Sequence, residues 1–524
     1  MKAVRTFFAA ILILLVISVP AFAGEAKGVF KMGYTFEDEE GSQAVERSSY
    51  NVYEGFGLSL EDVIWTFGDG FRLNADLKNI TLNNRNLMLG LQKDNLYRFD
   101  LYNHQYRRVY DFDGSKFTRR HNSGGSFWHS AHKYLRLYGG MNYFGRSGNQ
   151  LNVFDTFDDN ATAIPEEVDY NQTNYHFGMT FRQKGRMLQG EFRGSSFSDN
   201  EDSSRDQKRQ AVKLWGFVPV PSYEWIRLHG GFRHFETKYQ ETEFKISANT
   251  VWGGAQVYLP FNLSLSYYGM LDRAQSDSDL VATDNMSHAV YGTYTFPRKA
   301  GLTAGYQFDT VDDFEDEVEA NSIYLYGWFK PMPKLDIRAE FGSRAEEMFA
   351  GSRVLGDVDQ TKHRVTVKYK FSDYNYIRGK MMLRSRESDY LGTEVDFWRG
   401  ALDGYYKLTT YADLSIGYNY TEGEYTNMTA MFEFSDHLIY GDLILNEPLS
   451  LKGTVLSFGG MYYKSKRDLD IEKITLRFGA EYNLFRDYYL EADYDVHNFD
   501  DLTVLDRYYT ANIVTISLNK RFNY

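Results

Sequence analysis

The chain of 524 residues contains no cysteine and only 9 prolines, and it has no long apolar run beyond its first residues. The lack of cysteine excludes disulfides, thiolate metal sites and the CxxCH motif that attaches haem covalently. No segment after residue 23 approaches about 18 consecutive apolar residues, and the mean hydropathy is −0.49, which excludes a helical membrane protein. A chain without cross-links must rely on backbone hydrogen bonding, which a closed barrel satisfies completely.

Basic residues are fewer than acidic residues. The chain has 58 Lys and Arg against 71 Asp and Glu, a net charge of −13, which argues against nucleic acid as a partner. Histidine pairs such as His229 and His234 are separated by an odd number of residues, so on a strand they lie on opposite faces and cannot share a metal. No HExxH motif or Ser-His-Asp arrangement is recognisable. We therefore expect no enzyme activity, no metal site and no cofactor bound by the chain.

Aromatic residues are abundant, and the first 23 residues have the features of a secretory signal. The chain has 42 Tyr and 39 Phe, which fit the aromatic girdles of a membrane barrel. Lys2 and Arg5 precede the apolar stretch from Phe7 to Val19, and a small-x-small site ends at Ala23. We expect residues 1–23 to be a signal peptide and residues 24–524 to form one domain.

Apolar and polar residues alternate along this whole domain with a period of two. In one example, Leu263, Leu265 and Tyr267 share a face, while Ser264 and Ser266 share the other. The pattern predicts an all-β fold with about 26 strands (range about 22 to 26), each near the 9–11 residues that a tilted transmembrane strand needs. A soluble β-sandwich also alternates, but the signal peptide and the unequal connections favour a single large antiparallel transmembrane β-barrel in the cell outer membrane.

The predicted connections alternate between short and long. Short ones include Gly68-Asp69-Gly70 and Pro260-Phe261, and long ones include Val109 to Ala131, Asp158 to Asn171 and Glu346 to Gln360. Short periplasmic turns and long extracellular loops are typical of outer-membrane barrels. Strands begin almost directly after Gly24, so we expect no plug domain of the kind found in 22-stranded transporters.

The last predicted strand resembles the carboxyl-terminal signature by which the barrel-assembly machinery recognises outer-membrane barrels. Leu518, Phe522 and the final Tyr524 fall on one apolar face, which Lys520 interrupts. An ordinary terminal strand would explain the alternation but not the aromatic end. We expect the assembly machinery, lipid and lipopolysaccharide to be partners of the chain.

Charged residues on the polar faces of the strands are the candidate functional residues. A charge facing lipid near the membrane centre costs roughly 2–4 kcal/mol, so these side chains should face the lumen. A basic wall across from an acidic one could set ion selectivity, although mutual pairing that stiffens the wall is an equally good interpretation. The predicted lumen-facing charged residues are Arg364, Lys368, Lys370, Arg378, Lys380, Arg384, Arg386, Glu491, Asp493 and Asp495.

Acidic runs fall in or beside predicted loops. They comprise Glu37 to Glu40, Asp158 to Glu167 and Asp309 to Glu317. Carboxylates there could hold divalent cations beside lipopolysaccharide. The runs lack the regular ligand spacing of a calcium loop, which favours a solvated surface.

The run from Leu87 to Tyr110, an aromatic and arginine-rich strand pair before a long loop, resembles the MtrB/PioB group of outer-membrane barrels. The resemblance implies a barrel that sheathes a multihaem cytochrome, so that electrons cross the membrane along the haems of the partner. The chain departs from some members in having no CxxC near its amino terminus. The alternatives are a wide diffusion porin for small polar or anionic solutes and, with less support, a surface adhesin.

Overall fold

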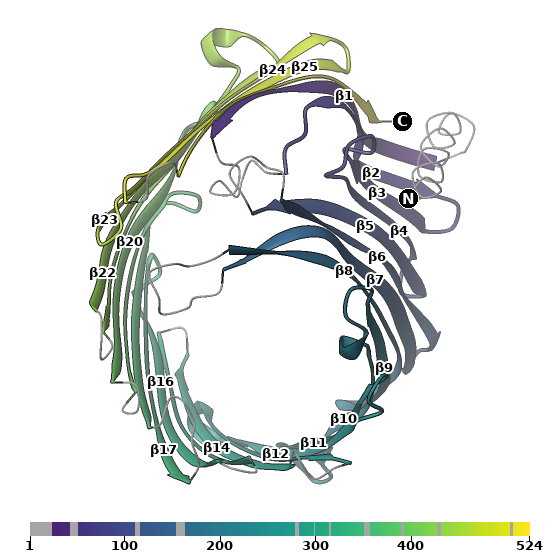
Figure 1. Cartoon of the computed structure of the whole chain (residues 1–524), viewed down its shortest axis with the longest axis vertical. Coiled ribbons are helices and arrows are strands. Elements are labelled where there is room, and N and C mark those ends of the chain that lie inside the picture. Colours follow the sequence, from purple (N-terminus) through teal and green to yellow (C-terminus); the bar gives the residue numbers. More distant parts are fainter. Residues whose placement is uncertain are drawn as a thin grey trace.

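A computed structural model shows one continuous antiparallel sheet of 26 strands that closes on itself. It describes residues 24–41, 51–110, 116–153, 163–277, 282–297, 299–313, 316–350, 357–388, 392–426, 431–503 and 507–523. The predicted signal peptide and Tyr524 lie outside these residues. Figure 1 looks down the barrel and shows the strands following one another around a ring in sequence order.

The strands occupy nearly all of the described residues. Their bounds are β1 (Gly24–Gly41), β2 (Gly55–Phe67), β3 (Phe71–Lys78), β4 (Asn86–Lys93), β5 (Tyr97–Val109), β6 (Phe117–His132), β7 (Leu135–Val153), β8 (Ala163–Gln183), β9 (Arg186–Asp199), β10 (Gln207–Val220), β11 (Tyr223–Tyr239), β12 (Lys245–Leu259), β13 (Leu263–Ser276), β14 (Ala282–Phe296), β15 (Ala300–Asp313), β16 (Asp316–Met332), β17 (Leu335–Ala350), β18 (Val358–Lys370), β19 (Tyr376–Ser388), β20 (Thr393–Thr409), β21 (Ala412–Thr426), β22 (Met431–Asn446), β23 (Thr454–Arg467), β24 (Ile471–Phe485), β25 (Tyr488–Asp501) and β26 (Tyr508–Asn523). Three short 3-10 turns complete the elements: η3 (Ser203–Arg205), η4 (Pro260–Asn262) and η5 (Pro448–Ser450).

The first and last strands seal the barrel. β1 pairs with β26 in an unbroken antiparallel register from Lys27 opposite Asn523 to Gly41 opposite Tyr509. Each strand pairs with its sequence neighbours, so the closed sheet has no free edge strand. The predicted single antiparallel barrel of about 26 strands is confirmed.

The two ends of the barrel differ in their connections. We call the end that holds the connections after even-numbered strands the turn end, and the opposite end the loop end. At the turn end most connections are tight, as in Gly68-Asp69-Gly70, where both glycines have positive φ. Gly24 and Asn523 also lie at the turn end.

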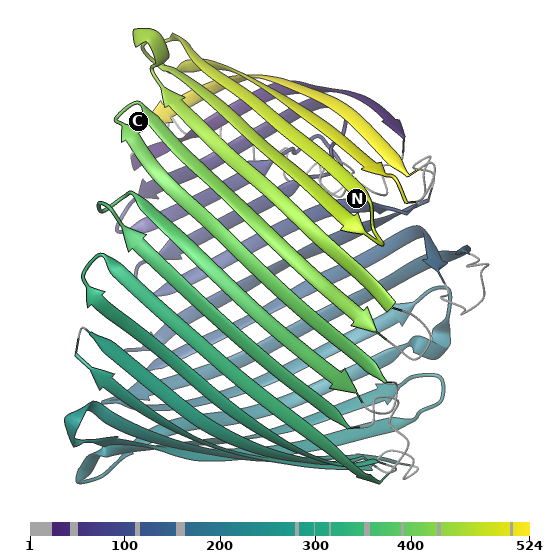
Figure 2. The ribbon, with the colours of Figure 1, turned by 90° about the vertical axis from the view of Figure 1, so that its left-hand side faces the viewer.

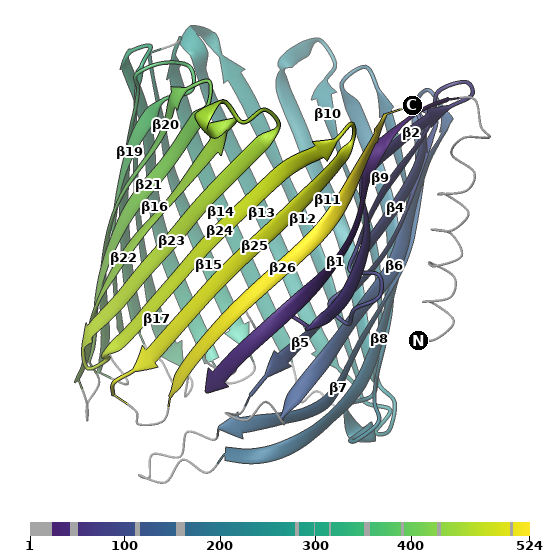
Figure 3. The same cartoon turned by 90° about the horizontal axis from the view of Figure 1, so that it is seen from above.

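The strands are longer, and the loops shorter, than the sequence suggests. The expected loop from Val109 to Ala131 contains most of β6, which begins at Phe117, and the expected loop from Asp158 to Asn171 contains the start of β8. Figure 2 shows the strands crossing the wall obliquely. Figure 3 shows the β7–β8 hairpin reaching past its neighbours, and in Figure 1 its outer end runs inward from the wall across the opening.

The ring bends sharply near β1 to β4. The register shifts between Lys27 and Val29 where β1 pairs with β2, and again between Leu60 and Val63 where β2 pairs with β3. Such bulges bend and twist a sheet locally. At this crease a buried apolar cluster forms, comprising Leu60, Val63, Ala75, Leu77, Ile80 and Leu87, with Phe30, Leu89 and Phe522 packed against it.

The segment before β2 ties the crease together at the loop end. Val52 packs against the buried Tyr509, Ala511 and Ile513 of β26. The backbone N–H of Arg107 in β5 donates to the Asn51 side-chain oxygen (2.7 Å). The short β4 pairs with β5 only as far as His104. Asn51 therefore accepts a backbone hydrogen bond from a part of β5 that β4 does not reach.

Candidate functional site

The barrel wall has one apolar face and one polar face, which the strand register keeps separate on most strands. On β18, Val365 and Val367 lie on the apolar face, where they are 41% and 39% exposed, and they alternate with Arg364, Thr366 and Lys368 on the polar face. The apolar face also carries exposed large residues on other strands, including Phe177, Val251, Leu302 and Ile439. A continuous exposed band of this kind is typical of a lipid contact, because water would oppose it by about 25 cal/mol per Å².

The predicted basic residues lie together on the polar face of two neighbouring strands. We call this group the basic cluster: Arg364, Lys368 and Lys370 of β18, and Arg378, Lys380, Arg384 and Arg386 of β19. Lys368 lies directly opposite Arg378, and the other residues interleave with them along the same face. These residues therefore share one face of two paired strands, and their role stays a prediction.

Carboxylates on the flanking strands hold part of the basic cluster. Arg378 makes a bidentate contact with Asp403 of β20, with Nε 3.0 and 3.1 Å from the two carboxylate oxygens. On the other side, Glu340 of β17 pairs with Arg364 and with Lys362 (3.3 Å). These contacts stiffen the wall, as the pairing interpretation predicts.

Other cations of the basic cluster have no such partner. Within the described residues, Lys370, Lys380 and Arg386 form no ion pair. The Lys368 ammonium lies 3.8 Å from the centre of the Tyr376 ring, and Arg384 donates to the Gln360 side-chain oxygen (3.4 Å). The cluster thus keeps an excess of positive charge beside a hollow of about 460 Å³, which is lined by Asp336, Arg338, Glu340, Arg364, Lys368, Arg378 and Lys380 among others.

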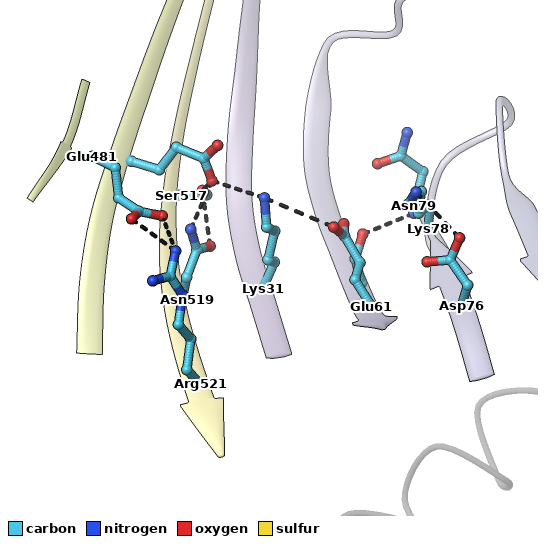
Figure 4. A network of polar contacts seen from close by, with 11 residues as sticks. Lys31, Glu61, Asp76, Lys78, Asn79, Glu481, Ser517, Asn519 and Arg521 are labelled. Carbon is cyan, nitrogen blue, oxygen red and sulfur yellow. Dashed lines mark hydrogen bonds and ion pairs between the residues drawn. The ribbon is translucent and has the colours of Figure 1, made fainter. Parts of the chain in front are cut away.

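The predicted acidic residues lie on β25, next to the seam between β26 and β1. The Glu491 carboxylate accepts hydrogen bonds from Lys31 (2.8 Å), Asn519 (2.6 Å) and Ser517 (3.3 Å), and so links three strands across the seam. Figure 4 shows this network, including the nearby contact of Arg521 with Glu481.

The other two carboxylates of this group are less constrained. Asp495 lies 4.0 Å from Arg477. The Asp493 carboxylate has no hydrogen bond or ion pair within the part of the chain that the structure describes.

The basic cluster and the acidic residues do not face each other across the barrel. Only β20 to β24 separate β19 from β25, so the two groups lie on adjoining parts of the ring. Each group pairs with local neighbours and not with the other. The expectation of a basic wall across from an acidic one is therefore wrong, because the position of a strand in the ring follows from its place in the whole strand order.

A second basic surface does lie across the barrel from the basic cluster, on β5 to β11, and the sequence analysis missed it. Its arginines contact aromatic or neutral groups more often than carboxylates. Arg136 stacks on Trp128 (4.4 Å to the ring centre), and Arg120 donates to the Tyr106 hydroxyl (3.1 Å). These cations retain their charge because such partners do not neutralise it. The sequence signal was weak because each strand contributes only one or two of these arginines.

The described residues of the carboxyl-terminal strand fit the predicted signature. Leu518 and Phe522 lie on the apolar face of β26, opposite Met32 and Gly28 of β1. Tyr524 lies outside the described residues, and recognition by the assembly machinery stays a prediction.

The described residues contain no group of three His, Asp or Glu side chains that could hold a metal. The register places His229 opposite Gly254 and His234 opposite Asn249, on opposite faces of β11, as expected. Among the described residues no helix is long and apolar enough to cross a membrane.

No family model matches the chain, and no curated protein matches it in sequence. Solved structures match the fold. The siderophore receptor PirA from Pseudomonas aeruginosa aligns with a TM-score of 0.51 and 10% identity, over 82% of this chain and 81% of the receptor. The ferric enterobactin receptor PfeA from the same organism aligns with a TM-score of 0.51 and 9% identity, over 96% of this chain and 82% of the receptor.

The fold is that of an outer-membrane β-barrel. At such low identity the likeness extends to the fold alone, and it confirms the expected architecture and outer-membrane setting.

Proposed function

We propose that the chain is the sleeve of a trans-outer-membrane electron-transfer complex, in which the polar face surrounds a multihaem cytochrome. The observation that carries the proposal is a closed wall of 26 strands whose described residues leave its interior without a domain. In this proposal the partner carries the electrons, and the barrel supplies a polar interior and an insulating wall.

The width of the wall supports an occupant. With strands about 4.8 Å apart and tilted by about 40°, a ring of this strand number measures about 50 Å between opposite backbones. Porins with 16–18 strands already leave an aqueous channel. An empty barrel of this width would let solutes leak across the membrane.

The connections that the structure describes at the loop end do not close such an opening. The described connections at the loop end, such as 79–85 and 200–206, are brief. Even a connection of about nine residues that runs out and back reaches only about 15 Å. Of the described elements, the β7–β8 hairpin reaches inward over part of the opening in Figure 1.

The charges on the polar face suit a protein partner. The basic cluster and the arginines of β5 to β11 present cations on two opposing sides of the ring, which would attract acidic surfaces of an occupant. The haem-protein identity of the occupant rests on the resemblance of the Leu87 to Tyr110 run, which forms β4 and β5.

Purification of the tagged chain from its native membrane in mild detergent tests the proposal. We expect a haem-staining protein to co-purify in a fixed ratio to the barrel. Recovery of the barrel alone, with haem protein left in other fractions at every detergent tested, would contradict the sleeve function.

A wide pore for anionic solutes is the second candidate, and the unpaired Lys370, Lys380 and Arg386 favour it. Planar-bilayer recording of the purified barrel distinguishes the two. High conductance by the native preparation, with anions preferred, supports the pore. High conductance only after removal of a partner supports the sleeve.

A further inference from the structure

We infer that the polar face of β8 to β11 contains a binding site for a multiply charged oxyanion, such as a polycarboxylate or a polyphosphate. The site is a hollow of about 620 Å³. Among the residues lining it are Arg193, Arg209 and Arg233, each from a different strand. The inference concerns this chain alone and holds whether or not the barrel has an occupant.

The register brings the three arginines around a floor of small side chains. Arg193 of β9 lies opposite Ala211 of β10, and Arg209 lies opposite Ser195. Both small residues line the hollow, with Phe235 of β11 beside them. Short side chains between long cationic ones leave a concave space on the polar face.

Each guanidinium is held by a neighbour that leaves other donors free. Arg209 donates from Nε to the Gln207 side-chain oxygen (3.0 Å), and Arg233 donates from one terminal nitrogen to the Thr250 hydroxyl (3.0 Å). Arg193 contacts Glu191 through Nε. Because a guanidinium has five N–H donors, each of these arginines keeps donors for a ligand.

The carboxylates near the hollow do not cancel the positive charge. Glu191 is engaged by Arg193 and by the Tyr138 hydroxyl (2.8 Å). Asp272 lies 3.8 Å from Arg233 and accepts from Thr250. A further cation, Lys213, lies directly opposite Arg233 in the ladder. Two carboxylates therefore face four cations.

Lys213 and Arg233 lie directly opposite each other, and like charges in that position are destabilising, although Glu191 lies opposite Lys213 on its other side. An anion in the hollow would reduce the repulsion between these cations. The side chains of Arg193 and Arg233 are 69% and 50% exposed, so a ligand in the lumen could reach them. A bidentate guanidinium contact selects planar or tetrahedral oxyanions over chloride, and three such groups favour a ligand with several charges.

Equilibrium dialysis of the purified barrel against radiolabelled citrate at low ionic strength tests the site. We expect saturable binding that weakens at least about tenfold in the triple variant Arg193→Gln, Arg209→Gln, Arg233→Gln, since the loss of even one charge-assisted bond of about 1.5 kcal/mol weakens binding about tenfold. Arg227→Gln is the matched control, because Arg227 lies on the same face of β11 but contacts Tyr258 near the turn end (5.0 Å to the ring centre). It should bind citrate as the unmodified chain does.

Non-saturable binding by the unmodified chain, or equal affinity in the triple variant, would overturn the inference. Pyrophosphate in place of citrate shows whether the site prefers phosphate or carboxylate. Citrate binding to the empty barrel but not to a barrel purified with a partner would show that acidic groups of the partner fill the same site. The citrate and pyrophosphate measurements on the empty barrel do not depend on whether a haem protein co-purifies.

Discussion

At the scale of single residues, the crease near β1 to β4 contains the larger of the two clusters of buried apolar side chains among the described residues. Leu77 is fully buried and Leu87 is 1% exposed, whereas most large apolar residues of the wall face outward. A barrel of this width has no central core. Tight packing at the crease therefore replaces a core in fixing how the sheet bends.

Leu77→Ala tests this packing. We expect it to lower the free energy of unfolding by about 2–5 kcal/mol, because the substitution leaves a cavity in a closely packed cluster. Leu325→Ala is the control, since Leu325 is 40% exposed on the apolar face. Urea unfolding in detergent measures both variants, and an equal loss in the two would show that the crease is not a special packing site.

Glu491→Gln tests the polar network at the seam. Lys31 and Glu491 are 29% and 25% exposed, and the substitution leaves the Lys31 ammonium without its closest carboxylate. We expect a loss of about 1–3 kcal/mol. Asp495→Asn should cost less than about 1 kcal/mol, because its contact with Arg477 is long and exposed. Chemical unfolding compares them, and a larger effect of Asp495→Asn would contradict this ranking.

At the scale of elements, alternation located the strands but not their ends. β18 and β19 follow the pattern closely, and the sequence grouped their charged residues on one face. β6 does not follow it, because Arg119, Arg120, Asn122 and Ser123 give it no continuous apolar face. Hydrogen bonds to β5 and β7 hold β6 in the sheet, and this backbone pairing does not require alternating apolar side chains.

The lack of a local sequence pattern also explains why the arginine site of β9 to β11 was not predicted. The basic cluster occupies two adjacent strands and was visible in a short stretch of sequence. The arginines of β9, β10 and β11 converge only when three strands are placed side by side in register. Sequence reasoning identified each as a polar-face residue at most, and had no means to place them around one hollow.

The last strand, β26, closes the barrel by pairing with β1. Ile516→Pro removes a backbone donor from β26, which pairs with β25 on one side and β1 on the other. We expect the variant to fail to close, and so to lose the faster migration of folded barrels on unheated gels. Ile516→Ala keeps the donor and should migrate as the unmodified chain does. A folded, heat-modifiable Ile516→Pro barrel would argue against a seam formed by β1 and β26.

At the scale of the whole molecule, the fold of large outer-membrane receptors is combined with an interior that the described residues do not fill. One face of the wall is apolar and the other face is charged. Packing at the crease and hydrogen bonds at the seam between β1 and β26 stabilise the wall. A ring of this width, with short connections among the described residues of the loop end, supports the proposal of an occupant that keeps the membrane sealed. The proposed sleeve function rests on that argument.

Single cysteines provide the most direct measurement, because the chain has none of its own. Thr366→Cys lies on the polar face and Val367→Cys on the apolar face of the same strand. In membranes holding the barrel without a partner, a bulky water-soluble maleimide should label Thr366→Cys and not Val367→Cys, and the native complex should protect Thr366→Cys as well. Labelling of Val367→Cys, or equally fast labelling of Thr366→Cys in the complex and in the empty barrel, would contradict a polar lumen that encloses a partner.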